Sequence, residues 1–146
     1  MARYSAGVLT GAGSTTLPII SLYGTAAVGA RIREIGLTNT TSTAVALRRI
    51  RLVATGTQGA ALVEAKHDIE SGAAVCTAVT THTVDPTASS VDLGYRASLG
   101  AAVGAGVIWT FGDTGLRVQP ATTSGIGVIV ENGTGQAIQA YIVWDE

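Results

Sequence analysis

Alternation of apolar and polar residues with a period of two is the feature that most limits what this chain can fold into. The clearest cases are two runs near the C-terminus with an apolar residue at every second position: Ile126, Val128 and Val130, then Ile138, Ala140, Ile142 and Trp144. This pattern is typical of strands that bury one face, so we expect strands near 126–131 and 137–144. The turn residues Asn132-Gly133 lie between the runs and predict that the two strands pair as a β-hairpin.

Two upstream segments change parity part-way along. In Ala44–Ala54 the apolar parity shifts at Arg48-Arg49, and in Arg31–Asn39 it shifts between Ile32 and Ile35. A β-bulge adds one residue to a strand and moves the side chains that follow to the other face. We therefore predict a long strand with a bulge in each segment.

Shorter alternating or β-branched segments, separated by turn residues, predict the remaining strands at 3–10, 17–23, 60–66, 74–84, 90–95, 106–111 and 115–119. Residues 60–70 could instead form a short helix, because their apolar residues also fall near helical spacing. About ten short strands and no composition break predict one all-β domain, a single antiparallel β-sandwich of jelly-roll type. We expect residues 1–16 to be an N-terminal arm or first strand, and residues 17–146 to be the β-sandwich.

The composition excludes several classes of protein. Of the 146 residues, 47% are hydrophobic and 13% are charged, and the net charge is -1. These values argue against a disordered chain and against a general nucleic-acid binder, which would carry a basic field. No apolar run is long enough to cross a membrane, and no signal sequence opens the chain, so we expect a protein made and used without export.

The low charge also predicts association. A typical domain has about 25% charged residues, and here Ala, Gly and Thr stand at many positions where a monomer would carry Lys or Glu. Surfaces with little charge often become interfaces, so we expect a homo-oligomer. The alternative is a neutral, Thr-coated sandwich that remains a monomer.

No pattern of reactive side chains predicts an enzyme or a metal site. His67 and His82 lie on either side of Ser71 and Cys76, but the chain has no Gly-x-Ser-x-Gly nucleophile elbow. Cys76 alternates with small apolar residues, as a buried side chain would. One cysteine and two separated histidines cannot form a structural zinc site. We expect no catalytic residue, metal or cofactor; an enzyme would need a pocket around His67 and His82.

Arginine is the strongest charged feature. Five arginines fall on two consecutive expected strands: Arg31, Arg33, Arg48, Arg49 and Arg51. If these strands pair, five guanidinium groups lie close together, and guanidinium pairs well with carboxylate and phosphate. The group is a candidate docking patch for an acidic partner. The alternative is a solvated strand face neutralised by Glu34 and Glu64. Arg3 and Tyr4 are further candidate contacts, because chain termini often become ordered only when docked.

Four segments resemble small structural proteins of tailed bacteriophages: Ala2–Gly7, Thr15–Tyr23, Arg31–Thr41 and Gly125–Gln136. Phage capsid decoration proteins of this size are often β-sandwich trimers at three-fold positions of the head. The resemblance implies a non-enzymatic virion protein, made in the host cytoplasm, that binds the outer capsid surface as a homotrimer. Its partner would be the major capsid protein, with no nucleic acid or membrane involved.

Ligand or glycan binding is the alternative function. A β-sandwich of a phage tail or fibre can bind a ligand or glycan through aromatic side chains on an end loop. Tyr95 and Tyr23 are the candidates for such contacts. The parity of Trp109, Phe111 and Trp144 instead favours packing in the core or at a subunit interface.

Overall fold

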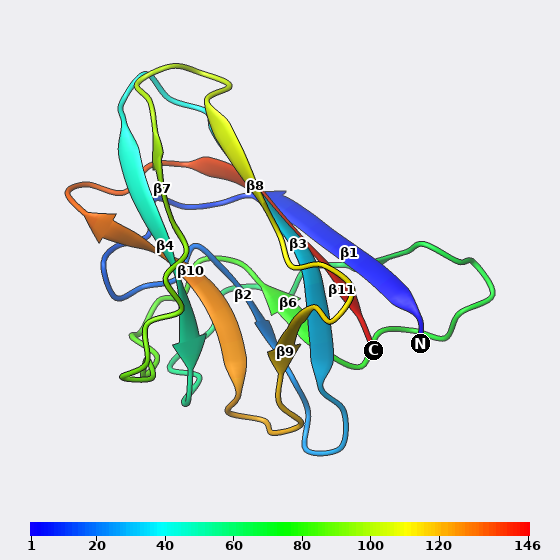
Figure 1. Cartoon of the computed structure of the whole chain (residues 1–146). Coiled ribbons are helices and arrows are strands. Elements are labelled where there is room, and N and C mark those ends of the chain that lie inside the picture. Colours follow the sequence, from blue (N-terminus) through cyan, green and yellow to red (C-terminus); the bar gives the residue numbers. More distant parts are fainter.

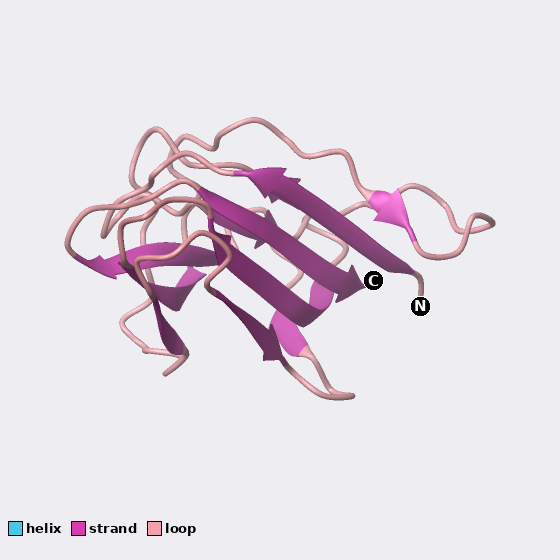
Figure 2. Cartoon of the chain, turned by 90° about the horizontal axis from the view of Figure 1, so that it is seen from above, coloured by secondary structure: helices cyan, strands magenta, loops and turns pink.

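Two antiparallel sheets face each other across one apolar core (Figure 1). The computed structural model describes all residues, 1–146. The first sheet has the order β5 (Ala65–Lys66), β1 (Arg3–Leu9), β11 (Ile138–Asp145), β3 (Ala30–Asn39) and β8 (Gly106–Thr110), and β9 (Leu116–Val118) also pairs with β3. The second has the order β6 (Thr77–Val79), β2 (Ile20–Tyr23), β10 (Gly125–Asn132), β4 (Val45–Leu52) and β7 (Arg96–Leu99). The chain forms no helix, so none could cross a membrane (Figure 2).

The pairing of the main strands is nested. β1 pairs with β11, β2 with β10, β3 with β8 and β4 with β7, always antiparallel. Strands β1 to β4 therefore pair with β11, β10, β8 and β7, in that order. The chain passes repeatedly from one sheet to the other. This is the jelly-roll topology, so the predicted fold class is confirmed.

The core follows from the alternation. Ile126, Val128 and Val130 of β10 are fully buried, as are Ile142 and Trp144 of β11. Each set occupies every second position of its strand, so one face of each sheet is apolar and turned toward the other sheet. Burial of these side chains is the main stabilising contribution, at roughly 1.5–3 kcal/mol for each large aliphatic group.

The predicted C-terminal hairpin is wrong, although both of its strands exist. β10 lies in the second sheet and β11 in the first, and residues 133–137 carry the chain between them. Gly133 has a φ of 75°, as the predicted turn requires, but the turn opens a crossing between sheets. Alternation identifies a strand and its buried face; it does not identify the neighbouring strand.

One of the two predicted bulges is confirmed. Along β3 the register with β11 slips between Glu34 and Ile32, which leaves Arg33 as the extra residue. In β4, by contrast, residues from Leu47 to Leu52 pair in step with β10, so there is no bulge at Arg48-Arg49. The parity shift has another cause: Ile50 is buried on the outer face of the second sheet, in a separate small apolar cluster.

The long connection from β4 to β7, residues 53–95, contains little regular structure. The strands predicted at 60–66 and 74–84 shrink to β5 and β6, and no helix forms at 60–70. The strand predicted at 90–95 is wrong, because the chain becomes a strand only at Arg96. Part of the connection covers the outer face of the second sheet, where His82 is buried. The division of the chain at residue 16 stays a prediction; residues 3–9 are β1, paired along their length with β11.

Candidate interaction face

The outer face of the first sheet is not covered by any other part of the chain. Apart from the ion-paired Arg3 and Asp145 at one end, its outward positions on these four strands are Ser5, Gly7 and Leu9 of β1, Gln139, Tyr141 and Val143 of β11, Glu34, Gly36 and Thr38 of β3, and Gly106, Ile108 and Thr110 of β8. We call these twelve residues the open face. Glu34 is the one charged residue among them, and Leu9 and Ile108 are each 59% exposed. An uncovered sheet face with so little charge is a candidate interface.

Tyr141 lies across the middle of the open face. A Cβ atom on Gly36 would come within 2.0 Å of its ring, so glycine on the neighbouring strand is what lets the ring lie flat. The Tyr141 hydroxyl donates a hydrogen bond to Glu34. Burial and then this carboxylate raise the pKa of Tyr141 to about 12, so the ring stays neutral. A shallow hollow of about 400 Å³ beside it is lined in part by Leu9 and Thr38.

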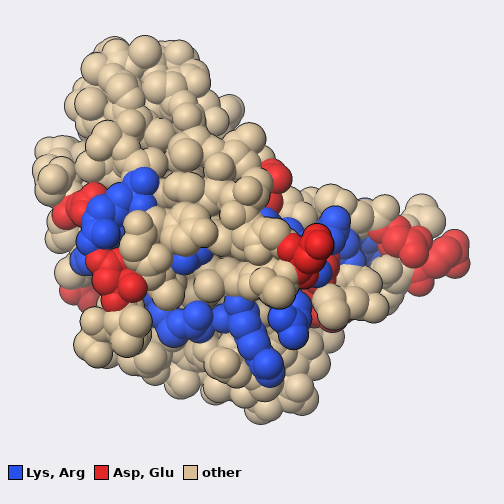
Figure 3. Space-filling model, in the orientation of Figure 1, with Lys and Arg blue, Asp and Glu red and all other residues tan.

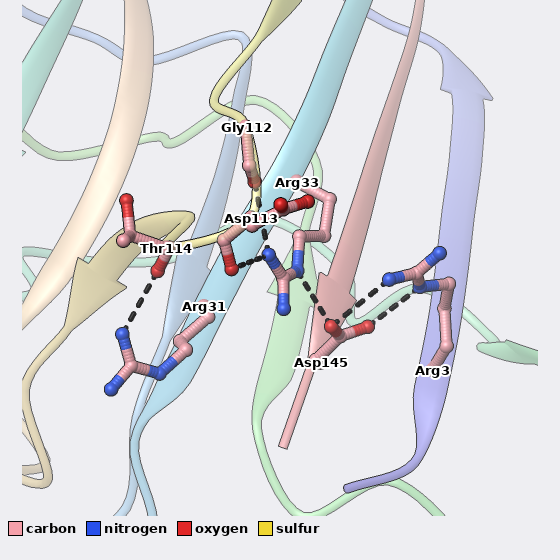
Figure 4. Close-up of polar contacts among 7 residues, drawn as sticks. All are labelled: Arg3, Arg31, Arg33, Gly112, Asp113, Thr114 and Asp145. Atoms are coloured by element: carbon pink, nitrogen blue, oxygen red, sulfur yellow. Dashed lines mark hydrogen bonds and ion pairs between the residues drawn. The ribbon is translucent and has the colours of Figure 1, made fainter.

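A carboxylate joins three strands at one end of the open face (Figure 4). Arg3 Nε and Nη2 donate to the two oxygens of Asp145 at 2.7 and 3.1 Å, and Arg33 Nε donates to Oδ2 at 2.6 Å. Arg33 Nη1 also donates to the carbonyl oxygens of Gly112 and Asp113 in the β8–β9 loop. The hydrogen bonds from Arg3, and then the one from Arg33, hold the pKa of Asp145 below its usual range. This cluster fixes β1, β11, β3 and the loop relative to one another.

Three further arginines lie around β9, which pairs with β3 and is contacted by a side chain of β4. Arg31 and Arg117 are opposite each other on β3 and β9, and Arg51 of β4 donates from Nη1 to the Arg117 carbonyl oxygen at 3.0 Å. Arg31 Nη1 donates to the Thr114 carbonyl oxygen at 2.9 Å. None of the three has an acidic side chain within 4.0 Å. We call Arg31, Arg51 and Arg117 the arginine row. Figure 3 shows basic side chains in a broken row across this side of the molecule, with acidic side chains gathered at its ends.

The predicted arginine patch is only partly formed. The two arginine-bearing strands do not pair, so the condition for a group of five is not met: β3 and β4 belong to different sheets. Arg51 reaches the β3 arginines only through β9. Arg48 instead lies on the outer face of the second sheet, beside Ile50 and Ile129. Arg117 was missed because it is a lone arginine in its segment, and only strand pairing brings it to the others.

Several other candidates are buried. Tyr4 is 3% exposed, packs against Trp144 and donates its hydroxyl to the Gly72 carbonyl oxygen at 3.0 Å, so it is not a surface residue. Tyr23 is 2% exposed, so it cannot be an exposed aromatic of an end loop. Tyr95 is partly exposed and leans on Phe111. Arg49 is 2% exposed and lies under Tyr95.

The histidines and the cysteine occupy different environments. His82 is buried, with Nε2 at 2.9 Å from Ser21 Oγ, and burial lowers its pKa. His67 is exposed in the loop between β5 and β6. Cys76 is buried as predicted, and burial raises the pKa of its thiol to about 12. No three His, Cys, Asp or Glu side chains gather where they could hold a metal ion.

Comparison with known proteins gives little further information. No protein-family model matches the chain, and no curated protein sequence matches it. A chain from the "Structure of a marine algae virus of the order Picornavirales" aligns over 96% of this chain and 65% of its own length, with 14% identity and a TM-score of 0.22. A TM-score this low carries no argument about fold or function.

Proposed function

We propose that the protein is a non-enzymatic virion structural protein that attaches to the outer surface of a phage capsid as a decoration or cement protein. The observation that carries the proposal is the open face, a nearly uncharged sheet surface that no part of this chain covers. A stable monomer usually carries charge on such a surface, whereas a subunit that is covered on assembly does not need it.

The arginine row gives the proposed contact with the capsid. Arg31, Arg51 and Arg117 have no acidic partner within the chain, and each guanidinium retains free donors. Guanidinium forms paired hydrogen bonds with carboxylate, so an acidic patch on the major capsid protein is the matching surface.

The open face gives the proposed contact between copies of the chain. Leu9, Ile108 and Tyr141 offer apolar area, and glycine lies opposite both Ile108 and Tyr141. We propose a trimer, because three linked copies would engage three symmetric capsid sites and gain affinity through effective concentration. The N-terminal segment takes part in this contact as β1.

Co-sedimentation with purified phage heads tests the attachment. The wild-type protein is expected to comigrate with heads at a fixed copy ratio. Arg31→Glu combined with Arg117→Glu should weaken attachment about tenfold or more, since two charge-assisted contacts become repulsive. Arg96→Glu is the control, because Arg96 lies elsewhere and is already paired with Asp92 and Glu131. Protein that stays at the top of the gradient would contradict attachment and favour a ligand-binding module of the tail or fibre.

Sedimentation velocity tests the oligomer separately, without heads. Ile108→Asp places a charge on an exposed apolar position of the open face, on edge strand β8, and is expected to convert the oligomer to a monomer. Val91→Asp is a matched control, because Val91 is exposed to a similar degree (64% against 59%) but lies in the connection before β7. A wild-type monomer, or equal effects of the two substitutions, would contradict this interface.

A further inference from the structure

A buried arginine with no counter-ion lies inside one end of the sandwich. Arg49 points inward from β4, opposite Val128 of β10, and is 2% exposed. Its guanidinium carbon lies 3.9 Å from the centre of the Tyr95 ring and 4.6 Å from that of Phe111. Both rings offer their π-electrons to the cation, which is favourable at a site shielded from water.

The hydrogen-bonding groups of this guanidinium are almost unused. Nη2 reaches the Leu93 carbonyl oxygen at 3.5 Å, a distance at which a hydrogen bond is weak. Nε and Nη1 are buried and have no partner. No acidic oxygen lies within 4.0 Å of the group.

An unpaired buried cation of this kind is uncommon. Burial lowers the pKa of Arg49 to about 10, which still leaves the side chain charged at neutral pH. Buried charges in proteins are normally paired, because an isolated charge in a low-dielectric site is destabilising. The fold therefore buries a positively charged guanidinium group without a carboxylate from the chain to pair with it.

A hollow beside Arg49 has room for that complement. Its volume is about 270 Å³, and it is lined by Arg49, Tyr95, Thr110, Phe111, Gly115 and Leu116. At roughly 30 Å³ per water molecule, this space also suits a small organic acid or one acidic side chain. Phe111 and Leu116 give it an apolar wall for a carbon stem.

Tyr95 forms the solvent-exposed wall of this hollow. Its backbone is fixed by the hydrogen bond from Arg49 N to its carbonyl oxygen at 3.0 Å. The ring is 38% exposed, and no hydrogen bond holds its hydroxyl. The unpartnered atoms of the guanidinium are buried under this ring, so a carboxylate could reach them only if the ring rotated away.

We propose that this hollow is a carboxylate-binding site, in which Arg49 receives the carboxylate edge-on while Phe111 and Leu116 pack against the carbon stem. The carboxylate could belong to a free small acid or to an acidic side chain of a docked protein. Carboxylate binding in this hollow does not require attachment to a capsid. A negative co-sedimentation experiment would therefore not contradict it.

Two-dimensional NMR of the purified protein tests the proposal with two probes. Sodium butyrate represents a free acid, and the capped peptide acetyl-Ala-Glu-Ala-amide represents an acidic side chain; sodium chloride at equal ionic strength is the blank. We expect saturable shifts at the amides of Tyr95, Thr110 and Leu116 and at the Arg49 Nε–H group. Tighter binding of butyrate would assign the site to free acids, and tighter binding of the peptide would assign it to a partner's side chain.

Variants separate the site from general anion binding. Arg49→Met keeps an unbranched apolar stem and removes the guanidinium charge, and it should raise the Kd for the bound probe by about tenfold or more. Lys66→Met removes an exposed cation from β5, an edge strand far from β7 and β8, and should leave the Kd unchanged. The proposal is overturned if neither probe gives saturable shifts, or if Arg49→Met binds as well as the wild type.

Discussion

Replacement of Arg49 by methionine should make the protein more stable at neutral pH in the absence of a carboxylate. Removing a buried charged side chain is usually destabilising because a partner is left unpaired. Here no partner exists, since the guanidinium contacts two aromatic rings and one distant carbonyl oxygen. Methionine is smaller than arginine, but it is flexible and apolar and packs well against aromatic rings.

The expected gain follows from two opposing contributions. The fall of the Arg49 pKa to about 10 corresponds to roughly 3 kcal/mol against holding the charge in the folded protein. The contacts with Tyr95 and Phe111 return about 2 kcal/mol, because cation–π contacts are strongest when desolvated. Arg49→Met should therefore raise the free energy of unfolding by about 1 kcal/mol, or Tm by about 2–4 °C.

The pH dependence gives this prediction a second readout. A base whose pKa is lowered on folding destabilises the folded state fully at pH values below its folded pKa. That penalty disappears as the pH rises above about 10, where the folded side chain loses its proton. The stability difference between Arg49→Met and the wild type should therefore be constant from pH 6 to 9 and shrink above pH 10.

Thermal and urea unfolding in a buffer without carboxylate or phosphate are the appropriate assays. Arg96→Met is the control, because Arg96 is half-exposed and ion-paired, and its loss should change stability by about 0.5 kcal/mol or less. The reasoning is refuted if Arg49→Met unfolds at least about 1 kcal/mol more easily than the wild type. Such a result would mean that Arg49 has a stabilising partner, such as bound water, that satisfies its free donors.

Three further predictions concern other buried groups. Asp145→Asn should lower the free energy of unfolding by about 2 kcal/mol, since it uncouples the arginines of β1 and β3, whereas exposed Asp113→Asn should have no measurable effect in urea unfolding. Stability should fall between pH 7 and 5, because unfolded His82 takes up a proton that buried His82 does not; His82→Gln should remove this slope and His67→Gln should retain it. Cys76 should resist a thiol reagent at pH 8 until the protein unfolds, and reaction at the rate of a free thiol would contradict its burial.

The strands could be predicted from the sequence wherever one face is buried and the other is not. Alternation located β10 and β11 within one residue at each end, and the parity change in 31–39 correctly indicated the bulge at Arg33. In β4 the same kind of change was misleading. There both faces are covered, so Ile50 can be apolar without an extra residue in the strand.

Strand pairing could not be predicted in the same way. Neighbours in a jelly roll are far apart in the sequence, and the pattern of a strand contains no information on its partner. The hairpin expected at Asn132-Gly133 and the paired arginine strands were both inferred from closeness along the chain. The arginine row could not be predicted either, because Arg117 lies beside Arg31 only through the pairing of β9 with β3.

The nested topology has a consequence for synthesis on the ribosome. β11 is the middle strand of the first sheet and β10 is the middle strand of the second, and these are the last two strands to be made. Until residues 125–145 emerge, β1 and β3 have no strand between them, and neither do β2 and β4. Each sheet then exists only as two separate halves with open edges, which are aggregation-prone. The nascent chain should therefore depend on chaperones until its final segment inserts, and that insertion should complete both sheets in one late, cooperative step.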